Sequence, residues 1–174
     1  LISGVSRGLT HELVRHRVGV AISQRSTRYV DESESEWAWH PLVEADQDNR
    51  DEGRDLLPIV RDVYTRIYHN TLALLEARGV SAGAAKKQAR GAARGALGNA
   101  LATELVWTAN LRALRHFIEL RATEFADGEI RLLANKLWEA AREIVPEYFG
   151  DYERHDHPDM AGVGYGLRTA HRKV

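Results

Sequence analysis

Residues 100–121 read ALATELVWTANLRALRHFIELR and contain the pattern that decides the fold. Residues 100–108 are rich in residue types that favour β-strands. Asn110 is a suitable N-cap, and residues 111–121 repeat apolar side chains at the three- and four-residue steps of a helix. The stretch therefore predicts a short strand followed at once by a capped helix.

One side chain of this predicted helix does not match its surroundings. The side chains separate into an apolar arc with Leu111, Leu114, Phe117 and Ile118 and an opposite polar arc with Arg112, Arg115, His116 and Glu119. Arg121 falls inside the apolar arc. Because burial of an unpaired guanidinium costs several kcal/mol, Arg121 needs an acidic partner or a ligand. A structural ion pair, or a side chain that reaches solvent at the helix end, is the alternative to a ligand cavity.

Further elements follow on both sides of this stretch. Helical periodicity predicts a helix over residues 54–78 that ends at Gly79, a second from Ser81 to about Leu97, and another from about Asp127 to Val145. Upstream, we expect a strand end at Leu1 and Ile2, a short arginine-containing helix from Thr10, a loop or irregular strand over 18–30, and an acidic surface loop over 31–53. The segment from Arg154 has no periodicity and is predicted to be extended or mobile.

The composition fits one globular domain. Apolar residues make up 44% and charged residues 28% of the 174 residues, no apolar run reaches membrane-spanning length, and no secretory signal precedes the first motif. We therefore expect a cytoplasmic protein with no membrane partner. The chain has no cysteine, which excludes disulfides, thiolate metal sites and a cysteine nucleophile. The histidines show no metal-ligand spacing, so no metal is expected.

The charge distribution favours small anionic ligands. The net charge is −1, so nucleic acid is not an expected partner. Residues 1–30 nevertheless hold five arginines against one acid, and residues 86–121 hold seven basic residues against two acids. Local basic clusters in a nearly neutral protein suit small anions, although solvated faces would also explain them.

Three basic clusters are candidates for binding. Arg15-His16-Arg17 places three cationic or potentially cationic side chains in a row, and guanidinium groups bind phosphates in bidentate fashion. Residues 23–29, SQRSTRY, combine hydroxyls, an amide and arginines in a loop that suits a phosphate. Arg90 and Arg94 lie one turn apart on a predicted helix among small residues. Each cluster taken alone is equally compatible with a solvated surface.

Together, these motifs resemble the flavin-dependent thymidylate synthases, the ThyX family. The resemblance rests on GVSRGLTHELVRHR at residues 4–17, SQRSTRYV at 23–30 and the stretch 87–134, and it covers most of residues 3–150. It implies a ThyX-like α/β (α+β) fold, mainly helical over this chain with a small sheet. It also implies a homotetramer with active sites at the subunit interfaces.

The resemblance assigns roles residue by residue. It implies FAD contacts for Arg15, His16, Arg17, Gln24, Asn110, Arg112 and His116. It implies nucleotide contacts for Glu12, Arg15, Gln24, Arg25, Ser26, Thr27, Arg28, Arg94 and Arg121. The catalytic roles fall on Ser26 and on Arg121, the arginine that the helical pattern marks separately as needing a partner.

The reaction implied by the resemblance is methylation of uracil C5. FAD would be the cofactor, methylenetetrahydrofolate the carbon donor, NADPH the reductant, and dUMP the substrate that becomes dTMP. The absence of cysteine fits this chemistry, because the unrelated thymidylate synthases without flavin need a cysteine nucleophile. Two alternatives stay open: C5 methylation of UMP in nucleoside-antibiotic synthesis, and a non-catalytic helical module that binds nucleotide.

The chain also departs from the family pattern. Glu12 stands where glutamine is usual, Gly98 where proline is usual, and the spacing from Arg17 to Ser26 is one residue longer than the common form. We expect a catalytic domain over residues 1–153, without the N-terminal part of the family domain, followed by an extended tail over 154–174.

Overall fold

The computed structural model describes residues 1–172, which divide into two compact units. The first unit contains residues 1–7, 24–39 and 43–105, and the second contains 8–23, 40–42 and 106–172. Within residues 1–172, no helix combines the length and the apolar character needed to cross a membrane.

A three-stranded sheet has the order β1-β3-β2, and its strands are β1 (Ile2–Ser6), β2 (Val20–Gln24) and β3 (Ala102–Ala109). β1 runs antiparallel to β3 with Ile2 opposite Leu105, and the register shifts near Gly4, whose φ is +68°. The strand predicted over 100–108 is confirmed. The prediction that a strand ends at Ile2 is wrong, because β1 begins there.

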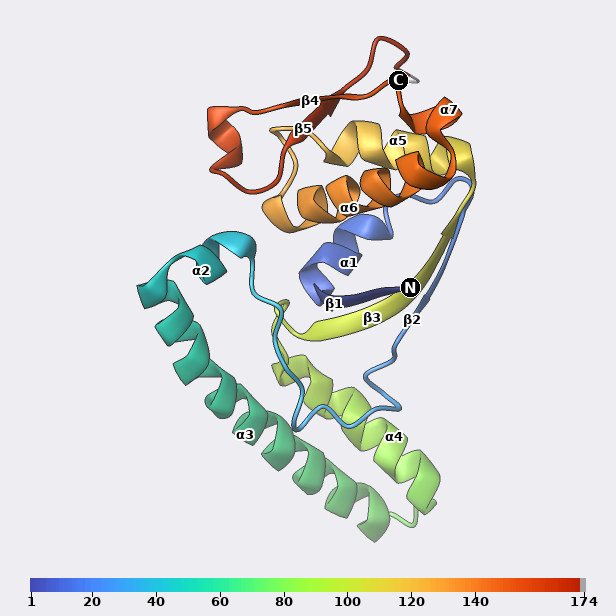
Figure 1. Ribbon diagram of the computed structural model, residues 1–174. Helices are drawn as coiled ribbons and strands as arrows, with labels where there is room; N and C mark the ends of the chain where they lie inside the picture. The colour runs from blue at the N-terminus through green and yellow to red at the C-terminus, as the bar shows by residue number, and fades with distance from the viewer. Residues whose placement is uncertain (173–174) are drawn as a thin grey trace. The chain divides into compact units, whose positions relative to one another are not determined.

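In the first unit, helix α3 (Gln47–Ala77) packs against helix α4 (Ala82–Ala93), and the short 3-10 turn η1 (Arg94–Ala96) follows (Figure 1). Ala85, Ala89 and Ala93 are fully buried at four-residue spacing. Because their side chains are small, this face of α4 can approach α3 closely. The two predicted helices are confirmed, but the second gives way to the 3-10 turn after Ala93.

The acidic segment before α3 is more helical than its composition suggests. The prediction of a surface loop over 31–53 is wrong from Pro41 onward, because α2 (Pro41–Ala45) and the first turns of α3 lie there. Asp46 is the N-cap of α3, and its carboxylate accepts a hydrogen bond from the backbone N–H of Asn49. Acidic residues at this end also interact favourably with the helix dipole, so local composition and helix formation agree here.

The second unit is built around α5 (Leu111–Arg121) and α6 (Gly128–Ile144), with α7 (Pro146–Phe149) packed on α6. Asn110 caps α5 by accepting a 2.8 Å hydrogen bond from the N–H of Ala113, and Asp127 caps α6 in the same way through Glu129. These caps explain why both predicted helices are confirmed almost to the residue.

Helix α1 (Arg7–Leu13) differs from the prediction. Thr10 is not its N-cap but a buried residue in its interior, 1% exposed. The helix ends at Leu13, so Arg15, His16 and Arg17 lie in the turn that follows it and not on the helix. The directions of the three side chains are therefore not fixed by helical geometry.

The segment from Arg154 is an ordered hairpin. Strands β4 (Glu153–His155) and β5 (Gly166–Arg168) pair antiparallel, with the 3-10 turn η2 (Pro158–Met160) between them. Met160, Val163 and Leu167 are buried, and the N–H of Leu167 donates to the carbonyl of Ala122 at 2.8 Å. The strands give the predicted extended backbone, and the buried apolar side chains hold the hairpin against the rest of the second unit.

Candidate active site

A cavity of about 540 Å³ lies within the second unit. Its walls come from the turn after α1, the start of β2 and one face of α5. The lining residues are Arg15, His16, Arg17, Val18, Val20, Ala113, His116, Leu120 and Arg121. The cavity is therefore rich in cationic and imidazole side chains, with apolar side chains between them.

Arg121 is held in place at the wall of this cavity. Its Nη1 donates to Glu12 Oε2 at 2.8 Å, and its Nε donates to His16 Nε2 at 3.0 Å. The Arg121 side chain retains 19% exposure. The acidic partner and the cavity are thus both present, and the two explanations weighed for Arg121 do not exclude each other.

His16 is a neutral imidazole at neutral pH. Burial, the nearby Arg121 cation, His116 and Arg15 lower the pKa of His16 to about 4. Since Nε2 accepts the hydrogen bond from Arg121, the ring proton of neutral His16 resides on Nδ1. The ring also packs edge-on against Phe117, with centroids 5.0 Å apart. His16 therefore orients Arg121 without adding a charge to the cavity.

The lowered pKa predicts a pH-dependent stability. The unfolded chain takes up the His16 proton near pH 6.5, whereas the folded chain takes it up only near pH 4. Stability should therefore fall as the pH drops from about 6.5 to about 4, by about 1–2 kcal/mol from this residue once solvent screening is allowed for. NMR titration of the imidazole should give a midpoint near pH 4, and His16→Gln should remove that part of the stability loss. A midpoint near pH 6.5 would contradict this arrangement.

Arg15 and Arg17 provide unpaired cationic groups. Both are exposed, and neither forms an ion pair with a carboxylate anywhere in residues 1–172. Two guanidinium groups beside the apolar Val18 and Leu120 suit a ligand that combines anionic groups with a flat apolar part. FAD has this chemistry, so the cavity fits the cofactor that the sequence implies.

The predicted flavin-contacting residues are only partly brought together. Arg15, His16, Arg17 and His116 share the cavity, and Asn110 lies at the start of α5, where it caps the helix. A Cβ at position 19 would stand 2.4 Å from Asn110 Nδ2, so Gly19, with φ +74°, permits this close approach.

Arg112 is exposed on the first turn of α5 and does not line the cavity. His116 and Arg121 belong to opposite arcs of the helical pattern, yet both side chains line this one cavity.

The polar arc of α5 does not face solvent as its composition suggests. Arg115 and Glu119 are buried, at 7% and 5% exposure. Arg115 forms two hydrogen bonds with Asp151, of 2.8 and 2.5 Å, and its Nε lies 3.3 Å from Glu119 Oε1. The Arg115 guanidinium holds the pKa of Asp151 well below its usual range. This cluster was missed because Asp151 is 36 residues away in sequence and carries no motif.

Residues 24–29 of the predicted phosphate loop belong to the first unit. Ser26 starts a turn, in which its carbonyl accepts the N–H groups of Tyr29 and Val30 at 3.1 and 3.2 Å. Thr27 is buried at 4% exposure, whereas Arg28 and, after α4, Arg94 are exposed. The two arginine side chains are therefore accessible to a ligand, whereas little of Thr27 is.

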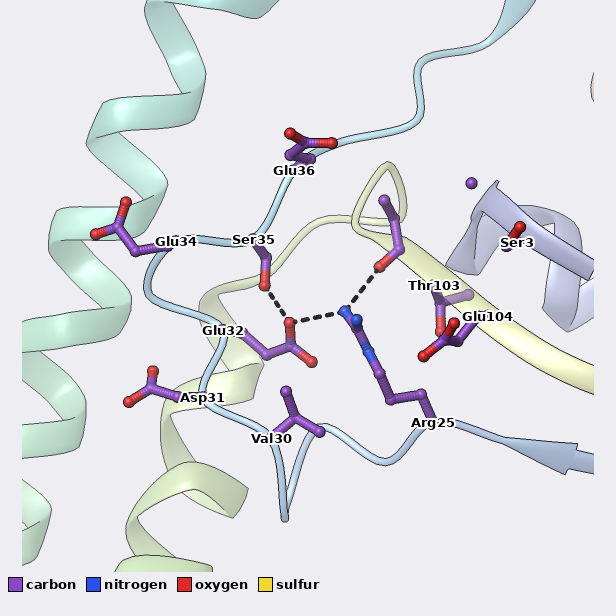
Figure 2. Close-up of a pocket in the computed structure, with 12 residues that line it drawn as sticks. Ser3, Arg25, Val30, Asp31, Glu32, Glu34, Ser35, Glu36, Thr103 and Glu104 are labelled. Carbon is purple, nitrogen blue, oxygen red and sulfur yellow. Dashed lines mark hydrogen bonds and ion pairs between the residues drawn. The ribbon is translucent and has the colours of Figure 1, made fainter.

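Beside this loop lies a second cavity of about 460 Å³, also within the first unit (Figure 2). The charged residues of its lining are mostly acidic: Asp31, Glu32, Glu34, Glu36 and Glu104 stand against the cation Arg25. Arg25 pairs with the buried Glu32 at 3.2 Å. No group of three or more potential ligand side chains within residues 1–172 is arranged to hold a metal ion.

The fold and the first cavity define a class of protein: an α+β protein with a cationic cavity whose lining suits an anionic, partly aromatic ligand. The chain belongs to the thymidylate synthase complementing protein family, whose sequence model matches residues 1–147. It is 43% identical over 155 residues to flavin-dependent thymidylate synthases of Mycobacterium avium and Mycobacterium tuberculosis. These matches cover 87% of the chain, and the chain spans about 60% of the length of these relatives.

Solved structures show the same fold. A crystal structure of the flavin-dependent thymidylate synthase ThyX from Helicobacter pylori, in complex with FAD and dUMP, matches with a TM-score of 0.54 at 23% identity. The match covers 86% of this chain and 70% of that one. A second structure of the H. pylori protein gives 0.52 at 24% identity. The predicted ThyX-like fold, mainly helical with a small sheet, is confirmed.

Proposed function

We propose that the protein methylates C5 of uracil in dUMP to give dTMP, as a flavin-dependent enzyme. Methylenetetrahydrofolate is the carbon donor and NADPH the reductant. The observation that carries this proposal is Arg121, a guanidinium fixed by Glu12 and His16 at the wall of a cationic cavity. Family membership supports the same reaction.

In this proposal the second unit holds the flavin. Arg15, Arg17 and His116 bind its anionic and carbonyl groups, and Asn110 and Arg112 contribute from the start of α5. Bound FAD, once reduced by NADPH, supplies the hydride for the reaction. No cysteine is present to form a covalent bond to uracil. The contribution of the side chains is therefore to bind and orient the reactants and to exclude water.

Arg121 has the electrostatic role. A fixed cation beside the pyrimidine lowers the free energy of negative charge on the ring. Because two hydrogen bonds already orient the guanidinium, little reorganisation is needed when that charge develops. Neutral His16 accepts one of these bonds and leaves the positive charge of Arg121 undiminished, whereas Glu12 offsets part of it.

The first unit contributes the nucleotide contacts. Ser26, Thr27 and Arg28 hold the phosphate, with Arg94 as a further cation and Gln24 between nucleotide and flavin. Ser26 is also assigned a catalytic role. We further propose a catalytic domain over 1–153, a C-terminal segment over 154–174, a homotetramer with sites at subunit interfaces, and a cytoplasmic location.

The decisive experiment is product analysis by mass. The purified protein is incubated with FAD, NADPH, methylenetetrahydrofolate and equal amounts of dUMP and UMP. We expect a yellow protein, faster NADPH oxidation when nucleotide is present, and dUMP converted to a product heavier by one methylene group.

Each other outcome identifies one alternative. Conversion of UMP would indicate the nucleoside-antibiotic type of activity. A protein that binds nucleotide but gains no flavin colour would be the non-catalytic module, and the proposed function would be wrong. The reaction without folate is the control, and it should leave both nucleotide masses unchanged.

A further inference from the structure

We propose that Glu32 is a positioning residue for nucleotide binding, which acts by closing the phosphate loop through Arg25. This inference rests on the proposed function. It assigns Arg25 a role through the loop conformation, since its guanidinium is bound to protein groups.

The bond between Arg25 and Glu32 joins the two ends of the phosphate loop. Arg25 Nη2 lies 3.2 Å from Glu32 Oε2 and 3.4 Å from the carbonyl of Ala102 on β3. The Ser35 hydroxyl donates to the same Glu32 oxygen. Figure 2 shows the three side chains converging, with the chain from Arg25 to Glu32 looping away between them. Ser26, Thr27 and Arg28 all lie within this closed loop.

Both ends of the loop are also fixed through the backbone. The N–H of Arg25 donates to the carbonyl of Glu104 on β3 at 3.0 Å, which extends the order of the sheet to the loop's first residue. The N–H of Glu32 donates to the hydroxyl of Tyr64 at 3.3 Å, and Tyr64 is fully buried in α3. The loop therefore spans two rigid elements of the first unit, and the ion pair joins its ends.

Further contacts of the first unit hold the flanking residues. The Arg61 guanidinium donates to the carbonyls of Glu34 and Ser35, and Arg90 donates to the carbonyl of Tyr29 at 2.8 Å. Glu32 is the central member of this set because its side chain is 1% exposed, whereas Arg25 retains 32%. A buried carboxylate that accepts from a guanidinium and a hydroxyl fixes the loop more strongly than an exposed ion pair does.

The consequence is an effect on nucleotide affinity that exceeds any effect on the chemical step. When the loop is already held in its binding conformation, the free-energy cost of ordering it on phosphate binding is smaller. Loss of the Arg25–Glu32 pair frees the loop and should weaken nucleotide binding, while the flavin site in the second unit keeps its residues. The expected signature is a raised KM and dissociation constant for dUMP, with a smaller fall in kcat because Ser26 lies in the same loop.

The test compares Glu32→Gln with a matched control, Glu34→Gln. Glu34 lines the same cavity, but its carboxylate has no contact with Arg25 among the described residues, so the control removes the same charge and leaves the ion pair. We expect Glu32→Gln to raise the KM and the dissociation constant for dUMP about tenfold, the effect of one charged hydrogen bond, with a smaller fall in kcat and with FAD affinity unchanged. Glu34→Gln should leave both constants within about twofold.

Three results decide the inference. Equal dUMP binding by wild type and Glu32→Gln would overturn it, as would an equal loss in both variants, and neither outcome affects the proposed function. If wild-type protein bound neither dUMP nor UMP, the proposed function would fail and the inference with it. Should Glu32→Gln not fold, Ser35→Ala decides in its place, because it removes only the hydroxyl donor to Glu32. We then expect a rise in KM of about threefold, and no change would overturn the inference.

Discussion

Arg121→Ala is expected to reduce kcat about 10²–10³-fold while fold and bound FAD persist, because the fixed positive charge beside the pyrimidine is lost. The side chain lies at a cavity wall with 19% exposure, so truncation leaves little new buried surface. Its partner Glu12 is 33% exposed and can be solvated when the guanidinium is gone. Single-turnover oxidation of reduced flavin, without oxygen and in the presence of dUMP and methylenetetrahydrofolate, measures the effect directly.

A graded control separates charge from geometry in this experiment. Arg121→Lys keeps the charge but cannot bond Glu12 and His16 through two fixed nitrogens, so we expect activity between that of wild type and Arg121→Ala. Far-ultraviolet circular dichroism and the flavin absorbance of each variant establish that fold and cofactor are retained. Wild-type turnover by Arg121→Ala would show that this arginine has no electrostatic role.

The largest expected effect on stability is at Asp151. Asp151→Ala leaves Arg115, which is 7% exposed, with two fewer hydrogen bonds and with Glu119 as its one paired carboxylate within residues 1–172. We expect a loss of about 2–4 kcal/mol in the free energy of unfolding, somewhat below the range for a fully buried pair because Asp151 itself is 27% exposed. Urea unfolding followed by tryptophan fluorescence measures this loss.

The sign of the pH dependence provides a second check on Asp151. Its pKa is lowered in the folded state, so the stabilisation is present above the ordinary aspartate pKa and is lost only as the solution becomes more acidic. The difference between wild type and Asp151→Ala should therefore be constant between pH 7 and 5. Glu139→Gln is the control, because its pair with Arg154 is about half exposed and contributes about 0–1 kcal/mol. Equal effects of the two variants would contradict the account of the buried cluster.

Local sequence information was sufficient to predict a helix and its bounds wherever an N-cap residue preceded a helical repeat of apolar side chains. Asn110 and Asp127 mark the starts of α5 and α6 because short polar side chains there bond the free backbone N–H groups of the first turn. The same reasoning failed for residues 41–53, where acidic composition was interpreted as a loop although it stabilises a helix start. It also failed for α1, since Thr10 resembles a cap but is buried by tertiary packing.

The candidate site was predictable to a similar extent. The position of Arg121 in the apolar arc of its helix indicated that it needs a partner. In the structure, Glu12 of α1 and His16, just after α1, are these partners. The identity of these partners depends on contacts over more than 100 residues of sequence, which periodicity does not encode. The buried pair of Arg25 and Glu32 was missed for a different reason: an arginine in a polar loop looks like a ligand contact, and nothing local shows that a carboxylate seven residues on is buried.

The central claim is that the guanidinium of Arg121 faces the pyrimidine in a cavity that also takes the flavin. A crystal structure of the protein with FAD and dUMP tests it through one distance, from the Arg121 nitrogens to the nearest uracil oxygen. The account predicts a hydrogen bond of about 2.7–3.2 Å, with the flavin against Arg15, Arg17 and His116. Both ligands bound elsewhere, with Arg121 still paired only with Glu12 and His16, would contradict it.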